Sequence, residues 1–122
     1  MHLVKQTRHG NKNGNCLPAC VASMTGLSIE AVDFDCHGKD WLAQYNDMMI
    51  HKYSKWLFPI DIVDHKYMRG AYIAIGKSAN NPDCDHAVLW KNGEIFFEPA
   101  GRYGKGLKGE PSNFIVILNH VE

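Results

Sequence analysis

Long hydrophobic runs are missing from this chain of 122 residues. Even its longest apolar runs, of which residues 114–118 are an example, are only five residues long. A helix needs about 20 consecutive apolar residues to cross a bilayer. Residues 1–6 also lack the apolar central region of a signal peptide. We therefore expect a cytoplasmic protein with no membrane partner.

The chain also has no excess charge of either sign. Its 13 Lys and Arg residues balance 13 Asp and Glu residues, and the basic residues are scattered. Nucleic acids and anionic membrane surfaces attract clustered basic residues, so neither partner is expected. The glycine-rich stretch 99–111 lacks the Gly-Lys-Ser/Thr ending of a phosphate-binding loop. We interpret it as a solvated connection that borders a cleft.

Cysteines are few, and their spacing is not typical of a structural zinc site. With no export signal, the four thiols are expected to be reduced rather than paired in disulfides. Zinc remains an alternative, but none of the spacings is the two-residue knuckle that zinc folds favour. The sequence therefore predicts no metal and no organic cofactor. The soft ligands considered are Cys16, Cys20, Cys36, His37, Cys84 and His86.

The length and the 45% apolar content predict a single domain over residues 1–122. Apolar residues at helical spacing predict a helix from Cys16 to Gly26, a short helix capped by Ser28, and a third helix from Trp41 to about Lys55, ended by Pro59. Short apolar or alternating runs predict strands at 60–63, 71–75, 86–90, 94–98 and 114–118. Helices followed by strands indicate an α+β fold, with N-terminal helices packed on a C-terminal antiparallel sheet.

Cys16 is the candidate nucleophile, because it stands where a loop becomes a helix. Leu17, Cys20, Val21 and Met24 recur at helical spacing, and Pro18 suits the first turn. The unpaired N–H groups and the positive dipole end of a helix N-terminus favour an anion, here a thiolate.

A base must be chosen from seven histidines, and His86 is the candidate. Only His86 opens a strand that pairs locally, through 91–93, with a strand ending in a carboxylate, Glu98. A two-residue turn would place Ala87 opposite Glu98, whereas a three-residue loop would place His86 there. We predict the three-residue loop. In this register Trp90 and Glu98 share the face of His86, and Ile95 lies on the other.

The order of these motifs resembles that of the papain-like cysteine peptidases, and particularly of the bacteriocin double-glycine leader peptidases and small bacterial and phage proteins similar to them. The motifs are a glutamine, a helix-opening Cys-Leu-Pro-Ala-Cys, a later His-Ala-Val, and an acid followed by proline, within residues 6–26 and 85–107. The resemblance implies a papain-like fold, Cys16 as nucleophile, His86 as general base and acid, Glu98 as the third member, and Gln6 in the oxyanion hole. The family usually has Asp or Asn where this chain has Glu98.

The implied activity is a cysteine hydrolase that cleaves an amide or thioester bond in a peptide or protein substrate. An acyltransferase or transglutaminase-like enzyme would use the same Cys-His pair with an amine acceptor. A catalytically inactive, peptidase-like binding module is the other alternative. The remaining cysteines, Cys20, Cys36 and Cys84, are expected to be inert.

Overall fold

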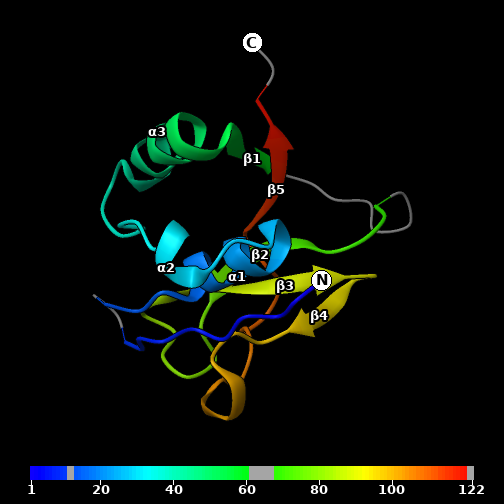
Figure 1. Cartoon of the computed structure of the whole chain (residues 1–122). Coiled ribbons are helices and arrows are strands. Elements are labelled where there is room, and N and C mark those ends of the chain that lie inside the picture. The colour runs from blue at the N-terminus through cyan, green and yellow to red at the C-terminus, as the bar shows by residue number, and fades with distance from the viewer. Residues whose placement is uncertain (11–12, 61–67, 121–122) are drawn as a thin grey trace.

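The computed structural model describes residues 1–10, 13–60 and 68–120. In these ranges, three α-helices precede all five strands of an antiparallel sheet, and the strands lie in the order β1-β5-β2-β3-β4. The predicted α+β fold, with N-terminal helices packed on a C-terminal antiparallel sheet, is confirmed (Figure 1). The elements are α1 (Cys16–Thr25), α2 (Ile29–Val32), α3 (Trp41–Tyr53), β1 (Lys55–Ile60), β2 (Tyr72–Lys77), β3 (Asp85–Lys91), β4 (Glu94–Phe97), the 3₁₀ turn η2 (Gly101–Tyr103) and β5 (Asn113–Asn119).

Helix α1 forms where the apolar spacing predicts it. Cys20 and Val21 are fully buried, and the helix ends at Gly26, whose φ of 78° is left-handed and costs glycine little. Ser28 accepts a hydrogen bond from the Ala31 N–H and caps α2, as expected. Helix α1 contacts α2 and β3, so the residue that opens α1 lies beside the sheet.

Helix α3 ends earlier than the sequence predicts. Ser54 adopts a left-handed conformation with φ 54° and ends the helix, and Lys55 already begins β1. Pro59 therefore lies inside a strand rather than ending a helix. Because β1 is at the edge of the sheet, the missing proline N–H is tolerated there. Of the strand predicted at 60–63, Ile60 ends β1 and residues 61–63 lie outside the described part of the chain.

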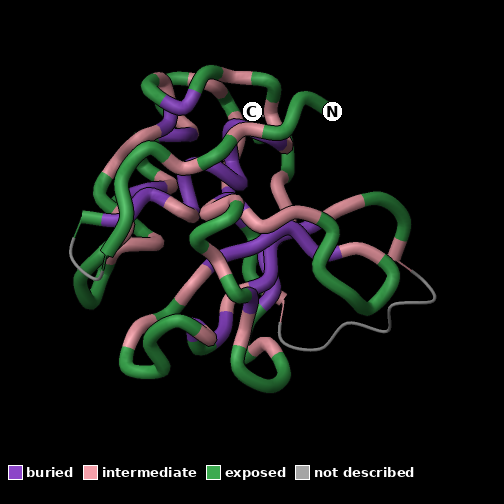
Figure 2. The backbone as a smooth tube through the Cα atoms, turned by 90° about the horizontal axis from the view of Figure 1, so that it is seen from below, coloured by how far each residue is buried: buried purple, intermediate pink, exposed green. Residues whose placement is uncertain are grey.

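The sheet carries a hydrophobic cluster on each face. Alternate strand residues face the helices, and their neighbours form a second cluster on the other face, as the strand period of two requires. Figure 2 shows the buried segments gathered in the middle of the molecule. The helix-facing cluster includes Leu17, Val21, Tyr45, Met49, Ile73, Leu89 and Ile115, and the other cluster includes Tyr72, Ala74, Val88, Trp90 and Phe114.

The hairpin between β3 and β4 differs from the prediction. Asn92 and Gly93 both have positive φ, 56° and 82°, and form a two-residue turn of the primed kind. Trp90 pairs with Ile95, so these two residues share a face, and the register then shifts so that Leu89 pairs with Phe97. The predicted three-residue loop is therefore wrong, as is the placement of Ile95. The shift is a β-bulge, which moves the end of β4 by one residue relative to β3.

In the described ranges, no helix is both long enough and apolar enough to cross a membrane.

Candidate active site

Cys16 is the first residue of α1, and its sulfur lies against the start of β3. The Ala87 N–H donates to Cys16 Sγ over 3.5 Å, which joins residues 71 positions apart in the chain. Cys16 is partly exposed, and Leu17 and Ala19 are buried behind it. The packing of α1 on β3 thus places the thiol beside His86, at the surface of the fold.

His86 and Glu98 form a short polar contact next to this thiol. His86 Nε2 is 2.6 Å from Glu98 Oε2, and the two side chains are 11% and 17% exposed. Glu98 follows the last residue of β4, so the contact depends on the bulge and on the chain leaving the strand. The sequence therefore predicted the right partners through the wrong register.

The loop after β4 holds the Glu98 carboxylate from its other side. The Gly106 N–H donates to Glu98 Oε1 over 3.3 Å. A Cβ atom at Gly104 would lie 2.0 Å from the same oxygen, so only glycine leaves room for the carboxylate. The stretch predicted to be a solvated connection therefore fixes the acid of the site as well as bordering the cleft.

The environment of His86 favours its charged form. Burial lowers the pKa of His86, but hydrogen bonds with Cys16 and Glu98 outweigh burial and raise this pKa from 6.5 to about 9. Because Nε2 faces Glu98, Nδ1 is the nitrogen left for Cys16. The surroundings of the ring therefore suit a protonated imidazole at neutral pH.

Gln6 lines the same cavity as Cys16 and His86. Its backbone N–H donates to the Pro99 carbonyl over 2.9 Å, so the N-terminal segment runs beside the loop that follows β4 (Figure 1). One hydrogen of the Gln6 amide goes to the Arg8 carbonyl over 2.9 Å, and the amide's second hydrogen is left for a ligand. Gln6 Oε1 is buried and has no hydrogen-bond partner among the described residues.

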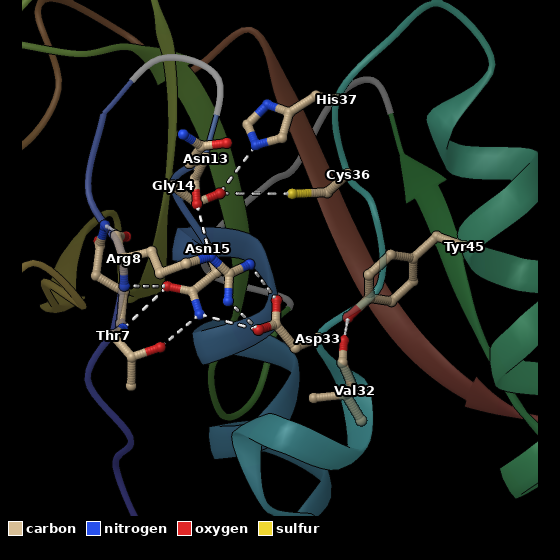
Figure 3. A network of polar contacts seen from close by, with 11 residues as sticks. Thr7, Arg8, Asn13, Gly14, Asn15, Val32, Asp33, Cys36, His37 and Tyr45 are labelled. Carbon is tan, nitrogen blue, oxygen red and sulfur yellow. Dashed lines mark hydrogen bonds and ion pairs between the residues drawn. The ribbon is translucent and has the colours of Figure 1, made fainter.

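A polar cluster holds the residues before Cys16, and the sequence interpretation missed it (Figure 3). Asn15 is fully buried, and its side chain contacts Thr7, Arg8 and Asp33. Arg8 Nη2 donates to Asp33 Oδ1 over 2.9 Å, and this contact holds the pKa of Asp33 below its usual range. The only sequence signal for this cluster is Asn15 itself, an N-cap type of residue directly before the cysteine.

The cavity around the sulfur has a volume of about 860 Å³. One part of its wall comes from α1, α3 and the connection before α3, where Leu17, Cys36 and Trp41 lie. Another part is more polar and comes from the β2–β3 connection, where Asn80 and Asp83 lie. A cavity of this size accommodates several residues of an extended chain.

The other three cysteines are also free thiols, and burial makes two of them, Cys20 and Cys36, less suited to nucleophilic chemistry. Cys20 is fully buried in the helix-facing cluster, and burial raises its pKa. Cys36 lines the cavity, but burial and neighbouring anions raise its pKa to about 12. Cys84 also lines the cavity, as its closeness to His86 in the sequence suggests.

Among the residues that the structure describes, no three His, Cys, Asp or Glu side chains converge in a way that could hold a metal ion. No cofactor-binding motif was identified in the sequence, and the site is built from the chain's own side chains and backbone groups. Its chemistry is that of a thiol and an imidazole at one cavity, with a carboxylate hydrogen-bonded to the imidazole.

Comparison with known proteins adds no relative to this picture: no family model matches the chain, and neither a curated protein nor a solved structure is significantly similar to it.

Proposed function

We propose that this protein is a cysteine hydrolase with a papain-like arrangement of Cys16, His86 and Glu98, acting on an amide or thioester bond of a peptide or protein. One observation carries the proposal. The Cys16 sulfur lies at the start of the strand that holds His86, both residues line the same cavity, and His86 Nε2 is 2.6 Å from Glu98 Oε2. A nucleophile, a base and a group that orients the base are the minimal parts of such a site.

In the proposed reaction, the Cys16 thiolate attacks the carbonyl carbon and a C–S bond forms. The carbonyl oxygen becomes an oxyanion, for which the Cys16 backbone N–H and the Gln6 amide are the donors. His86 gives its proton to the leaving amine or thiol as the scissile bond breaks. Water, deprotonated by His86, then hydrolyses the thioester and regenerates the thiol. Losing one oxyanion donor typically costs about 3 kcal/mol of transition-state stabilisation.

An acyltransferase or transglutaminase-like activity is the second candidate. It would share every step up to the acyl-enzyme, and an amine would replace water in the last step. The open cavity around the sulfur leaves room for such an acceptor. The four free thiols support a reducing, cytoplasmic setting for either reaction.

The proposal is tested with p-nitrophenyl acetate, an activated ester that needs no specific recognition. We expect the wild-type protein to release p-nitrophenolate in a burst of one equivalent and to carry the acetyl group on Cys16, located by peptide mass spectrometry. The Cys16→Ala variant should show no burst. A Cys20→Ala variant serves as the matched control, because it removes a buried thiol from the same helix.

A wild-type protein without a burst, or acetylated equally on several thiols, would contradict the hydrolase proposal and favour the binding module. A defined peptide mixture with and without a primary amine then separates the two enzyme classes. Free carboxylate products indicate hydrolysis, and amide products with the added amine indicate acyl transfer.

A further inference from the structure

Asn15 occupies the N-cap position of α1 without acting as a cap. Within the described part of the chain, its side chain makes no capping hydrogen bond to the N–H groups of the helix. Asparagine is among the best N-cap residues, so this position would normally satisfy one of the exposed N–H groups. The Cys16 and Leu17 N–H groups are too early in the helix to have an acceptor within it. Asn15 therefore leaves these two N–H groups, which lie beside the Cys16 sulfur, without a side-chain cap.

The Asn15 side chain instead binds the chain just after Gln6. Its Oδ1 accepts hydrogen bonds from the backbone N–H groups of Thr7 and Arg8, over 3.0 and 2.9 Å. Its Nδ2 donates to Thr7 Oγ1 over 2.8 Å and to Asp33 Oδ2 over 3.4 Å. The Asn15 backbone N–H donates to the Arg8 carbonyl over 3.2 Å. Every donor and acceptor of this fully buried side chain is engaged.

These contacts explain how a glutamine ten positions before the cysteine reaches the same cavity. Asn15 ties residues 7 and 8 to the start of α1 (Figure 3). The Gln6 amide in turn donates to the Arg8 carbonyl, the same atom that accepts from the Asn15 N–H. Asn15 therefore links the segment that binds the Gln6 amide to the start of α1.

Asp33 anchors the cluster from the end of α2. It pairs with the Arg8 guanidinium and faces the Asn15 amide. From the same connection, His37 Nε2 donates to the Gly14 carbonyl over 2.9 Å. Both residues before Cys16 are thus fixed from outside α1. Among the described residues, the hydrogen bonds of the cluster involve neither the His86 imidazole nor Glu98.

We propose that Asn15, supported by Asp33 and Arg8, is a positioning residue that sets the two oxyanion donors, the Gln6 amide and the Cys16 N–H, relative to each other. This inference rests on the hydrolase proposal and concerns only the carbonyl step. It predicts a selective defect. Removal of Asn15 should slow reactions that form an oxyanion and spare reactions of the thiolate that form none.

Two reagents that attack the same sulfur test this selectivity. In acylation by p-nitrophenyl acetate, the thiolate adds to a carbonyl, an oxyanion forms, and p-nitrophenolate leaves. In alkylation by iodoacetamide, the thiolate displaces iodide directly, so a C–S bond replaces a C–I bond without an oxyanion. We expect Asn15→Ala to slow acylation of Cys16 by about thirtyfold or more and to change the alkylation rate by less than about twofold.

Asn46→Ala is the matched control. Asn46 also bridges two elements through its side chain, since it donates to the Leu57 carbonyl over 3.0 Å and accepts from the Leu57 N–H over 2.7 Å. Asn46 does not line the cavity. We expect this variant to lose stability in thermal unfolding, as Asn15→Ala does, while both reaction rates stay at the wild-type level.

A second variant covers the case in which Asn15→Ala does not fold. Asn15→Asp keeps the acceptor for the Thr7 and Arg8 N–H groups but sets a carboxylate against Asp33. We expect slower acylation, and recovery of most of it in the exchanged pair Asn15→Asp/Asp33→Asn, which restores one amide and one carboxylate. The alkylation rate should be the same in the wild type, in Asn15→Asp and in the exchanged pair.

Parallel losses in both reactions, or equal acylation by Asn15→Ala and wild type, would overturn the role of Asn15 while leaving the hydrolase proposal intact. A wild-type protein that is alkylated at Cys16 but never acylated would overturn both. The two failures are therefore distinguishable in one set of measurements.

Discussion

The two sides of the candidate site are held in place by different means. On the nucleophile side, Cys16 and Gln6 are fixed by side chains, above all by the buried Asn15. On the base side, His86 is fixed by a strand, and Glu98 is confined by backbone, through the Gly106 N–H and the lack of a Cβ at Gly104. Polar substitutions should therefore disturb the first side, and steric substitutions the second.

Removing the His86 imidazole should have the largest effect, because this group of the base side acts directly on Cys16 of the nucleophile side. An unassisted cysteine thiol is only about 0.3% ionised at pH 6. With His86 charged beside it, Cys16 should react with iodoacetamide at pH 6, and His86→Ala should slow this reaction by roughly a hundredfold or more. The rate is measured by mass spectrometry with limiting reagent from pH 5 to 9. Equal alkylation rates in the wild type and His86→Ala would show that His86 does not activate Cys16.

The base side should also govern the pH dependence of stability. The raised pKa of His86, about 9 in the folded protein against 6.5 unfolded, stabilises the fold fully below pH 6.5. This contribution is lost as the pH rises through 9, and it amounts to about 3 kcal/mol. Urea unfolding between pH 6 and 9 should show the decline. Glu98→Gln removes a charge that raises the pKa of His86, so its decline should be smaller, and an unchanged slope would contradict this account.

A single methyl group should test the steric confinement of Glu98. Gly104 has φ −91°, which any residue adopts, but the added Cβ of Gly104→Ala would clash with the carboxylate. We expect acylation by p-nitrophenyl acetate to slow by about tenfold, because His86 loses its orienting partner. Gly109→Ala is the control in the same loop, since its Cβ meets nothing within 4 Å, although its φ of 78° costs some stability. Equal activity in both variants would show that the confinement is unimportant.

The smallest effect is expected for Glu98→Asp. Asp, the shorter acid, is a usual residue at this position in the family that the motifs resemble, and it keeps a carboxylate that can orient the imidazole. We expect a loss of only a few fold in the acylation rate, against a larger loss for Glu98→Ala. The burst kinetics of the two variants provide the measurement. If Glu98→Asp lost as much of the acylation rate as Glu98→Ala, the length of the Glu98 side chain would be essential.

Local patterns predicted those parts of the site that depend on neighbouring residues. The helical spacing after Cys16 and the stop at Gly26 predicted α1, and short apolar or alternating runs predicted β3 and β4. The hairpin register was wrong because the sequence allows both a two-residue and a three-residue turn. A bulge, which has no sequence signal here, then altered the pairing. The end of α3 was misplaced for a similar reason, since Ser54 ends the helix in a conformation unusual for serine.

By itself, the sequence determined that a thiol opens a helix and that a histidine and an acid lie on one hairpin, because periodicity and turn residues act over short distances. Only the tertiary structure decided that Gln6 reaches the thiol's cavity through Asn15 and that Gly104 makes room for Glu98. Those features depend on contacts between segments far apart in the chain. Such contacts form when α1 packs on β3 and the loop after β4 folds back, and no local pattern encodes them.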